Sequence, residues 1–579
     1  MDTLKHHLNT LIADALRSAT GITEVNANVI TASKPEYGDY QANGVMALAK
    51  QLKTNPRELA REVVGELEKT NTALVERYEI AGPGFINIYL SDALLIDRAN
   101  AILNKPDQLI PLTQLPQCIV VDYSSPNLAK EMHVGHLRGT IIGDSLVRVL
   151  ERLGHRIIRQ NHVGDWGTQF GMLIAHLQEI TAEQGDLPVR LADLEEFYKA
   201  AKDHFDSDTE FAATARNSVV KLQSGDAAYL AIWEQFIDES MRHCEAVYAK
   251  LNVTLTRADL DAESRYNDKL ANIVDVLDTQ GLLTESAGAK VVFLPEFMGK
   301  DDAPLPVIIK KSDGGYLYST TDLAAIEYRS ETLKADRSLY VVDVRQSLHF
   351  QQVFAVARAA GLAADSLSLE HIAYGTMMGK DGRPFKTRSG DAVKLVELLD
   401  EAIRRAYALV SKKNPGLDEM QKQQIAEKVG IAAVKYADLS KNRTSDYIFD
   451  WSTMLAFEGN TAPYLMYAYA RIKSILRKQD GGAASTRLDQ VTEPEERELL
   501  VKILQLPEVV QAVARDCYPN QLSNYLYELA GSFMRFYEAC PILKAEDAVR
   551  DSRLALSSLV AEALNQGLEL LGIKTLEQM

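Results

Sequence analysis

The spacing of apolar and polar residues divides the chain into three parts, of which the first spans residues 1–110. This part opens with an amphipathic helical pattern, MDTLKHHLNTLIADAL, and continues through a Gly/Tyr-rich segment at 34–44. A helical pattern at Met46–Leu67 and a strand-like pattern at Gly84–Leu90 follow. These elements predict a small N-terminal α/β domain, joined to the rest by a proline-containing linker at Asn104–Gln117.

Strand and helix patterns alternate in the second part, residues 111–415. Gln117–Tyr123 is short, β-branched and largely apolar, as expected of a strand that is buried on both faces. Helical periodicity then runs over about His136–Leu153, Gly154 is a natural helix stop, and Ile157 opens a second strand. A strand–helix–strand unit of this kind predicts a parallel sheet.

The same alternation returns later in this part. Ser338–Asp343 is predicted to be a strand, Leu348–Ala360 a helix and His371–Thr376 a further strand. The intervening residues, from about 187 to 251, are mostly polar with helical spacing. We therefore expect a helical insertion that splits a nucleotide-binding fold.

Strand patterns vanish in the third part, residues 416–579. Amphipathic helical patterns continue instead, for example at Glu458–Arg477, Glu495–Val513 and Leu522–Tyr537. The last part is therefore predicted to be an all-helical domain.

The composition is that of an ordinary globular chain, since 46% of its 579 residues are hydrophobic and 25% are charged. The apolar runs are too short to span a bilayer, and the polar N-terminal helix differs from a secretory signal. The four cysteines lack CxxC spacing, which argues against a disulfide scaffold and a cysteine-based zinc site; they are Cys118, Cys244, Cys517 and Cys540. We expect a cytoplasmic protein with no membrane partner and no structural metal.

The net charge of −17 lowers the expectation of a nucleic-acid partner, because such binding depends on the neutralisation of phosphates. The charge is an average over a large surface, however, and a basic stripe can coexist with acidic faces elsewhere. An RNA partner therefore stays open.

The segment Ser125–His136, SPNLAKEMHVGH, stands where the first predicted strand gives way to a helix. Ligands of open parallel sheets bind at the carboxyl ends of strands, and helix N-termini attract phosphate. The imidazoles of His133 and His136 can donate toward such a phosphate, and Gly135 leaves room for a flat adenine. Lys130 would neutralise ATP, although a chance histidine pair and a solvated lysine are the ordinary alternatives.

The longer sequence around this turn resembles the class I aminoacyl-tRNA synthetases, and specifically the arginyl-tRNA synthetases. Val121–Asp144 is similar to that family's form of the HIGH motif, and Asn161–Gly171, NHVGDWGTQFG, to a stretch typical of the family. The resemblance covers essentially the whole chain. It implies a Rossmann-like catalytic domain at 111–415, an N-terminal domain at 1–110 that contacts the tRNA elbow, and an all-helical anticodon-binding domain at 416–579.

The resemblance also implies the activity of an arginine–tRNA ligase, which forms arginyl-adenylate from L-arginine and ATP and transfers arginine to the 3′ end of tRNA(Arg). Such chemistry needs preorganised donors and cations around the phosphates rather than a nucleophilic side chain. Mg²⁺ would accompany ATP, and the chain is expected to be a monomer. The implied catalytic residues are His133, His136, Lys130, Lys386 and Arg388.

The second class I motif, KMSKS, is matched by Gly379–Gly390, GKDGRPFKTRSG. Ser389 stands where the family's final lysine is expected, and the resemblance assigns the work of that lysine to Lys130. A basic loop at the carboxyl end of a strand suits phosphate, although a solvated loop has the same composition. The residues implied to bind ATP are His133, Gly135, His136, Met377, Lys380 and Lys386.

An arginine substrate presents a planar fork of N–H donors, so its pocket needs carboxylates. Tyr318 and Asp322 are four residues apart in a helical pattern, and Asp122 ends the first strand. From the residues alone, Asp322 is better explained as a helix cap and Tyr318 as a core aromatic. The resemblance reverses this and implies that arginine is bound by Asp122, Ser124, Asn127, Tyr318, Asp322 and Gln346.

Both ends of the chain are implied to contact tRNA. The polar turn in the first part has a purely structural explanation of equal weight. Tyrosines of the helical part can stack on splayed bases, although tyrosines at helical spacing are more often core residues. The residues implied to bind tRNA are Tyr40, Gln41, Asn43, Tyr464, Tyr537 and Met579.

Three alternatives follow from the sequence. A different class I synthetase is one, but the Cys/His zinc ligands of cysteinyl and some other relatives are missing. An HxGH nucleotidyltransferase would be much shorter and would need no helical C-terminal domain. A non-catalytic tRNA-binding paralogue is expected to lose the two histidines or Lys130, all of which are present.

Overall fold

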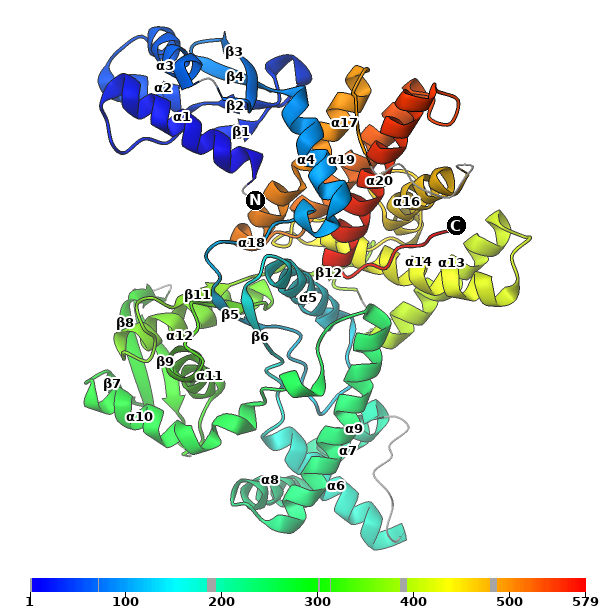
Figure 1. Ribbon diagram of the computed structural model, residues 1–579. Helices are drawn as coiled ribbons and strands as arrows, with labels where there is room; N and C mark the ends of the chain where they lie inside the picture. Colours follow the sequence, from blue (N-terminus) through cyan, green and yellow to red (C-terminus); the bar gives the residue numbers. More distant parts are fainter. Residues whose placement is uncertain are drawn as a thin grey trace. The chain divides into compact units, whose positions relative to one another are not determined.

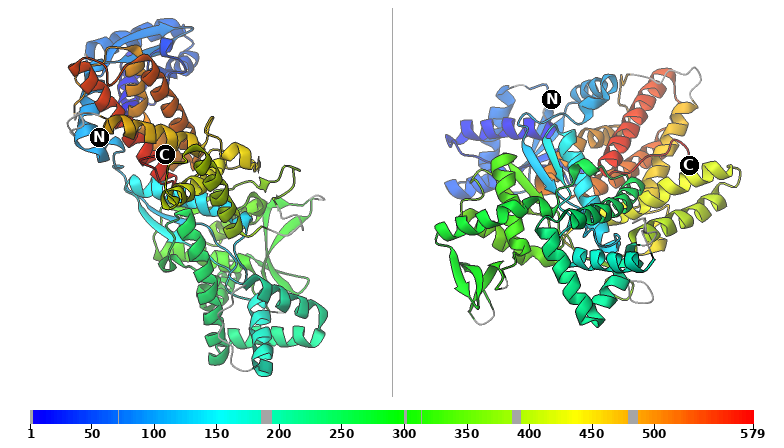
Figure 2. Two further views of the ribbon diagram at one scale, coloured as in Figure 1. Left: turned by 90° about the vertical axis from the view of Figure 1, so that its right-hand side faces the viewer. Right: turned by 90° about the horizontal axis from the view of Figure 1, so that it is seen from below.

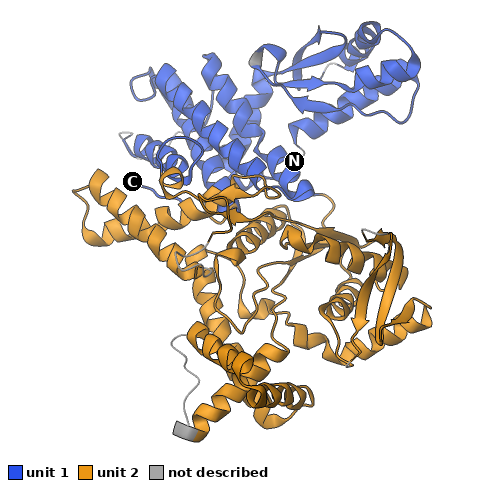
Figure 3. Ribbon diagram, turned by 180° about the vertical axis from the view of Figure 1, so that it is seen from behind, with its two compact units in different colours: residues 1–113, 456–570, 574–579 blue, residues 114–455, 571–573 orange. Residues whose placement is uncertain are grey.

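The structure, a computed structural model, describes residues 3–70, 72–184, 194–299, 302–312, 314–385, 393–478 and 487–579. The chain forms two compact units (Figure 3). Unit 1 comprises residues 1–113, 456–570 and 574–579, and unit 2 comprises residues 114–455 and 571–573. Unit 1 thus joins the N-terminal part to most of the C-terminal helices, while the domain boundaries near residues 110 and 415 stay predictions.

Unit 2 is built around a four-stranded parallel sheet of order β11-β10-β5-β6 (Figure 1). The strands are β5 (Cys118–Asp122), β6 (Arg156–Gln160), β10 (Arg337–Tyr340) and β11 (Ser368–His371). Ile119, Val120 and Val121 of β5 are fully buried, as expected of a central strand covered on both faces. The predicted α/β class with a parallel sheet is confirmed.

One helix connects the two strands of each half: α5 (Leu137–Arg152) follows β5, and α12 (Ser347–Ala359) follows β10. The prediction of a strand at His371–Thr376 is wrong, since β11 ends at His371. Glu370 of β11 forms an ion pair with Arg337 of the neighbouring strand, 2.8 Å apart. Because charged residues such as these interrupt the apolar pattern of an edge strand, the pattern does not reveal where the strand lies.

A three-stranded antiparallel sheet follows the insertion and was not predicted. Its strands, in the order β7-β8-β9, are β7 (Leu283–Ser286), β8 (Ala289–Met298) and β9 (Pro304–Lys310). It stands in the chain between α10 (Leu270–Thr279) and α11 (Tyr318–Glu327). The sheet leads the chain into α11, the helix that carries two of the predicted arginine-binding residues.

The insertion of unit 2 is helical (Figure 1), with α6 (Thr168–Gln184), α7 (Leu194–Ser207), α8 (Thr209–Gln223) and α9 (Ala227–Leu251). Later in the chain, α13 (Leu395–Lys413) and α14 (Glu419–Leu439) pack side by side (Figure 2). A buried ion pair between Arg138 of α5 and Asp438 of α14, 3.0 Å apart, fixes α14 against the first helix of the sheet. Short elements complete the unit: β12 (Met377–Met378), β13 (Tyr447–Ile448) and α15 (Trp451–Met454).

The N-terminal part of unit 1 is a four-stranded antiparallel sheet of order β1-β2-β4-β3 with three helices. The single helix predicted at Met46–Leu67 is wrong, because Lys53 has a left-handed backbone (φ 56°) and Pro56 begins a second helix. The elements are α1 (Leu4–Thr20), β1 (Val29–Thr31), β2 (Tyr40–Ala42), α2 (Gly44–Leu52), α3 (Pro56–Thr70), β3 (Val75–Ala81) and β4 (Phe85–Leu90).

The rest of unit 1 is helical. The single helix predicted at Glu495–Val513 is wrong, because the chain bends at Gln505 and restarts with Pro507 in the first turn of the next helix. None of the described helices has the length and apolar character needed to cross a membrane. The helices are α4 (Asp92–Asn104), α16 (Ala462–Arg477), α17 (Pro494–Leu504), α18 (Leu506–Asp516), α19 (Asn520–Ala539) and α20 (Asp547–Leu570).

Candidate active site

The loop that follows β5 has an unusual backbone. Ser124 (φ 71°) and Ser125 (φ 44°) both lie in the left-handed region that favours glycine, which costs about 1–3 kcal/mol per residue. Their surroundings hold them there: the Ser124 and Tyr248 hydroxyls are 2.8 Å apart, and the Ser125 N–H donates to Asn161 Oδ1 at 3.0 Å. The loop is therefore fixed at the carboxyl end of the sheet.

The loop after β6 runs beside this loop. The backbones of Asn127 and Gly164 pair as a short parallel bridge, and Leu128 N donates to Gly164 O at 3.0 Å. The side chain of Asn127 is exposed. The structure thus places Ser124 and Asn127, two of the predicted arginine-binding residues, on one fixed edge.

The HxGH segment forms a 3-10 turn at Val134–His136 that leads into α5. His133 is the cap of this turn, and its Nδ1 accepts the N–H of Gly135 at 3.0 Å. His136 Nδ1 accepts the N–H of His133 at 3.1 Å, and the two ring centroids are 4.0 Å apart. Since both Nδ1 atoms are acceptors, these bonds assign the proton of each neutral ring to Nε2.

Both imidazoles are held in the neutral form. Burial lowers the pKa of His136 to about 3, and burial likewise lowers the pKa of His133. Gly135 between them is exposed, and a Cβ there would lie 2.7 Å from the His133 ring, so a larger residue would displace that ring. The turn therefore presents two neutral N–H donors beside a side-chain-free stretch of backbone.

The side chains of the predicted phosphate-binding cations contact different parts of unit 2. Lys130 Nζ lies 4.4 Å from the centre of the Tyr198 ring of α7, a cation–π contact, and its charge contributes to the lowered pKa of His133. Lys380, which is exposed, pairs with Asp450 at 2.5 Å, and Met377 is buried in β12. Lys386 and Arg388 lie outside the described residues.

Asp122, at the end of β5, is buried and paired. Its Oδ2 accepts from Arg329 Nη2 at 2.8 Å, and its Oδ1 accepts from the Ser125 hydroxyl at 2.9 Å. Arg329 is itself fully buried and donates its Nε–H to Gln160 Oε1 at 2.6 Å. The protein thus fixes the orientation of this carboxylate from both sides.

Asp322 lies in the second turn of α11, where its Oδ2 is 2.6 Å from His349 Nε2. The Tyr318 ring, 60% exposed, contacts the ring of His349 with centroids 4.7 Å apart. Asp322 is therefore not a helix cap, and Tyr318 is not a core residue. Gln346 is exposed and caps α12, three residues before His349.

His162 lies within electrostatic reach of both aspartates. Burial alone would lower its pKa, but the bond to Asp261 and the negative charges of Asp122 and Asp322 raise the pKa to about 9. His162 Nδ1 is 2.9 Å from the carbonyl oxygen of Asp261. The structure therefore brings Asp122 and Asp322 to one cluster rather than to opposite sides of the unit.

Carboxyl groups outnumber cations in this cluster. Burial, with the charges of Asp165 and Asp322, raises the pKa of Glu263 to about 7, although the charge of His162 opposes this rise. Opposing charges come from Arg329, from Arg265, which pairs with Asp261 at 3.5 Å, from His162 and, when protonated, from His349. A site rich in carboxylate acceptors suits a cationic ligand. The carboxyl groups are Asp122, Asp165, Asp261, Glu263 and Asp322.

Several of these residues escaped prediction. His162 lies in the stretch Asn161–Gly171, which was recognised as a unit without a role for this histidine. Arg329 and His349 carry no local signal, because Arg329 is 207 residues from Asp122 and His349 is 27 residues from Asp322. Only the packing of the strands and helices brings them together.

The predicted N-terminal tRNA-binding residues are mostly covered. Tyr40 is fully buried, and its hydroxyl donates to Glu508 of α18 at 2.7 Å, so it has no exposed face for RNA. Gln41 donates to Asn87 Oδ1 at 2.8 Å, and Asn43 is half-buried. The polar turn thus serves to join the N-terminal sheet to the helices of unit 1.

The C-terminal candidates lie around α16. An open hollow of about 540 Å³ is lined by Met579 together with Arg471, Arg477 and Lys478. Arg471 also lies 4.5 Å above the centre of the Tyr537 ring. Arg471 thus lines the hollow together with Met579 and also contacts the Tyr537 ring, which is not itself a lining residue. Tyr464 contacts a different partner, Tyr527, with ring centroids 5.6 Å apart.

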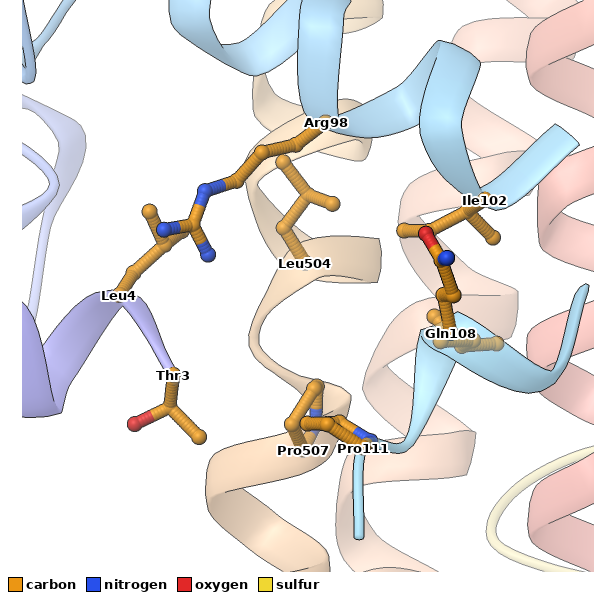
Figure 4. A pocket seen from close by; sticks show the side chains of 9 residues that line it. Thr3, Leu4, Arg98, Ile102, Gln108, Pro111, Leu504 and Pro507 are labelled. Carbon is orange, nitrogen blue, oxygen red and sulfur yellow. The ribbon is translucent and has the colours of Figure 1, made fainter. Parts of the chain in front are cut away.

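A second cavity in unit 1 is small. It measures about 20 Å³ and lies among α1, α4, α17 and α18 (Figure 4). Arg98, Leu4 and Leu504 are among its lining residues. This volume is close to that of one water molecule, so the cavity is too small for a nucleotide or an amino acid.

The chain matches three family descriptions. Residues 98–451 match "tRNA synthetases class I (R), catalytic domain", residues 465–579 match "DALR anticodon binding domain", and residues 6–90 match "Arginyl tRNA synthetase N terminal domain". Together these regions include the sheet, the HxGH turn and the basic hollow.

Curated relatives and solved structures agree with these matches. The chain is 57% identical to "Arginine--tRNA ligase" of Laribacter hongkongensis, with 100% of both chains covered, and 56% identical to that of Chromobacterium violaceum, with 99% and 100% covered. It is also similar to the arginyl-tRNA synthetase of Plasmodium falciparum (TM-score 0.85, 28% identity, 100% of both chains). The Thermus thermophilus arginyl-tRNA synthetase gives a TM-score of 0.82 at 27% identity, with 99% and 100% covered.

Proposed function

The chain belongs to the arginyl-tRNA synthetases, and from this premise we propose that it activates L-arginine with ATP and transfers the arginine to the 3′ end of tRNA(Arg). The observation that carries the proposal is a carboxylate-rich cluster at the same sheet edge as a turn with two neutral imidazole donors. The first suits a guanidinium group and the second suits phosphate oxygens.

In the arginine pocket, Asp322 and the Tyr318 hydroxyl accept the guanidinium N–H groups. His349 holds Oδ2 of Asp322, so Oδ1 is the acceptor for the substrate. Asp122, fixed by Arg329 and Ser125, contributes negative charge behind this contact. The α-amino and carboxylate groups of arginine are bound at the exposed edge formed by Ser124, Asn127 and Gln346.

In the first reaction, a carboxylate oxygen of arginine attacks the α-phosphorus of ATP, and the bond to pyrophosphate breaks. His133 and His136 donate Nε2–H to phosphate oxygens on which charge builds, and Lys130 adds a positive charge. Adenine lies against Gly135. Mg²⁺ accompanies ATP and neutralises part of its charge. The residues proposed for the second side of ATP are Met377, Lys380, Lys386 and Arg388.

In the second reaction, a hydroxyl of the terminal ribose of tRNA attacks the carbonyl carbon of the adenylate, and AMP leaves. The basic hollow beside Tyr537 and Met579 is proposed to bind the anticodon loop, because it combines cations with an aromatic ring. Tyr464 adds a second aromatic contact, and Gln41 and Asn43 contact the tRNA elbow. Tyr40 is left out of this surface because it is buried.

We propose a monomeric, cytoplasmic enzyme. Its domains are residues 1–110, 111–415 with the helical insertion at about 187–251, and 416–579. The first boundary follows the proline-containing linker at Asn104–Gln117, and the second follows the change from strand patterns to helical patterns.

Aminoacylation of total tRNA with each of the twenty amino acids, assayed separately, tests the proposal. Arginine alone should be charged, and only onto tRNA(Arg). Charging of a different amino acid would assign the chain to another specificity, and charging of none, by protein that still binds tRNA, would favour a non-catalytic paralogue.

A further inference from the structure

The helical insertion of unit 2 brings together three side chains of the kinds that bind transition metals. His176 and Glu179 lie three residues apart on one face of α6, and His204 lies on α7. One ligand atom from each side chain lies within 4.8 Å of the other two. His204 Nδ1 is 3.3 Å from Glu179 Oε2.

His176 has a ring nitrogen that lacks a partner. Its Nδ1 is buried and forms no hydrogen bond with any described residue. The ring lies among Phe197 and Phe211, with centroids 5.0 and 6.3 Å away. A neutral imidazole with an unsatisfied nitrogen is costly to bury, and it is also the form that binds a metal ion.

His204 is already oriented as a ligand. Its ring stacks on Phe211 with a centroid distance of 4.0 Å and an interplanar angle of 10°. With Nδ1 facing Glu179, its Nε2 lies 3.8 Å from Asp208 Oδ2. A carboxylate on the far side of a metal-binding histidine can orient its ring.

We propose that His176, Glu179 and His204 bind one Zn²⁺ ion, with water as the fourth ligand. Two imidazoles and one carboxylate favour zinc over Mg²⁺ or Ca²⁺, which prefer oxygen alone. Ligand atoms on a tetrahedral zinc lie about 3.4 Å apart, so separations of up to 4.8 Å in the cluster would contract by up to about 1.4 Å. Glu179 is exposed and can supply this movement by rotating its side chain.

The ion would connect α6 to α7 and act as a structural link. Tyr198 of α7, which contacts Lys130, is six residues before His204 in the same helix, so the link also steadies the helix beside the HxGH turn. This departs from the expectation of no structural metal, which depended on the spacing of the cysteines. Histidine and glutamate ligands from two helices have no such local signature.

Zinc titration of the full-length protein, after removal of metal with a chelator, tests the site. The variants are H176Q, H204Q and E179Q, and the matched control is H243Q. His243 also pairs with a glutamate in the insertion, since its Nε2 is 3.2 Å from Glu239 Oε1. Among the described residues, however, no third metal-binding side chain lies close to this pair. Calorimetry gives the stoichiometry, and Co²⁺ absorption reports the coordination geometry.

We expect one Zn²⁺ per chain in the wild type and in H243Q, with a rise in Tm and tetrahedral Co²⁺ bands. H204Q and E179Q, whose positions are partly or fully exposed and so tolerate substitution, should each lose about a hundredfold of zinc affinity or more. Equal binding by all variants would indicate an adventitious ion only and would overturn the site. Absence of stoichiometric binding by the wild type would overturn it as well.

Discussion

Two neighbouring regions of unit 2, the proposed sites for ATP and for arginine, suit opposite charges by different physical means. The HxGH turn places two neutral imidazoles at the start of α5, and burial keeps both of them uncharged. The pocket around Asp122 and Asp322 instead gathers several carboxyl groups around the cations Arg329 and His162. The HxGH turn offers oriented N–H dipoles to an anion, whereas the pocket offers carboxylates to a cation.

The difference follows from what each ligand brings. ATP changes its charge distribution during the reaction, and preorganised dipoles stabilise developing charge without rearrangement. The guanidinium of arginine keeps its charge throughout, so fixed carboxylates can bind it permanently. Buried carboxylates need support, and Arg329 and His349 supply it to Asp122 and Asp322.

The largest effect is expected from Asp322→Asn, which removes the charge but keeps the shape. Arginine-dependent pyrophosphate exchange should fall about a thousandfold in kcat/KM, because the guanidinium loses a charged acceptor. ATP binding should be unchanged. Asp365→Asn, at an exposed position after α12, is the control and should behave as the wild type. Normal exchange by the Asp322 variant would remove this residue from the pocket.

The charge of the pocket should also appear in the pH dependence of stability. The pKa of His162 is about 9 in the folded state and about 6.5 when unfolded, so the folded state binds the extra proton. Its stabilising effect is complete below about pH 6.5 and is lost as the pH rises through 9, by up to roughly 3 kcal/mol.

Chemical denaturation between pH 6 and 10 measures this change. His162→Asn should flatten the decline of the free energy of unfolding over that range. Glu263, whose pKa is raised from 4.5 to about 7, gives a decline in the same direction between these two pH values, which Glu263→Gln should remove when the series is extended down to about pH 4. An unaltered slope in the His162 variant would show that this histidine does not carry the charge of the cluster.

A pair of substitutions at His136 separates the two nitrogens of one ring. Asparagine reproduces Nδ1, which accepts the N–H of His133, whereas glutamine reproduces the Nε2 donor. His136→Asn should lower kcat for exchange by about a hundredfold with little change in the KM for arginine. His136→Gln should keep more activity. The reverse order would mean that the turn geometry, rather than the outward donor, limits the reaction.

The smallest effect of a substitution is expected in unit 1, where the proposed contact with tRNA is the stacking of a base on an aromatic ring. Tyr537→Ala should raise the KM for tRNA(Arg) about tenfold, because one base loses its aromatic partner. The value of kcat should change little. Tyr229→Ala in α9 serves as the control, and equal effects of the two substitutions would count against the basic hollow as an RNA site.

The elements that the sequence predicted well are those with a local pattern. The run Ile119–Val121 and the periodicity of α5 identified the first strand–helix unit, and the HxGH spacing identified its turn. Edge strand β11 and the sheet β7-β8-β9 were misplaced or missed because charged and proline residues interrupt their patterns. A turn at Lys53 and a bend at Gln505 likewise divided helices that their periodicity suggested were continuous.

The site was predicted to a smaller extent, because its chemistry depends on contacts between distant segments. The sequence identified Asp122 and Asp322, whose charges both raise the pKa of His162. It did not identify their hydrogen-bond partners, Arg329 and His349. The local sequence cannot show that Tyr40, which follows a glycine-rich turn, ends up beneath Glu508. Burial is decided by the partner that covers a residue, which lies elsewhere in the chain.

The comparison of arginine with citrulline as competitors tests most directly whether net charge selects the amino acid. Citrulline has nearly the same shape, but a neutral urea replaces the guanidinium. The inhibition constant of citrulline in arginine-dependent pyrophosphate exchange should exceed the KM for arginine by about a thousandfold or more. Citrulline binding within a few-fold of arginine would contradict the assignment of the carboxylate cluster as the arginine pocket.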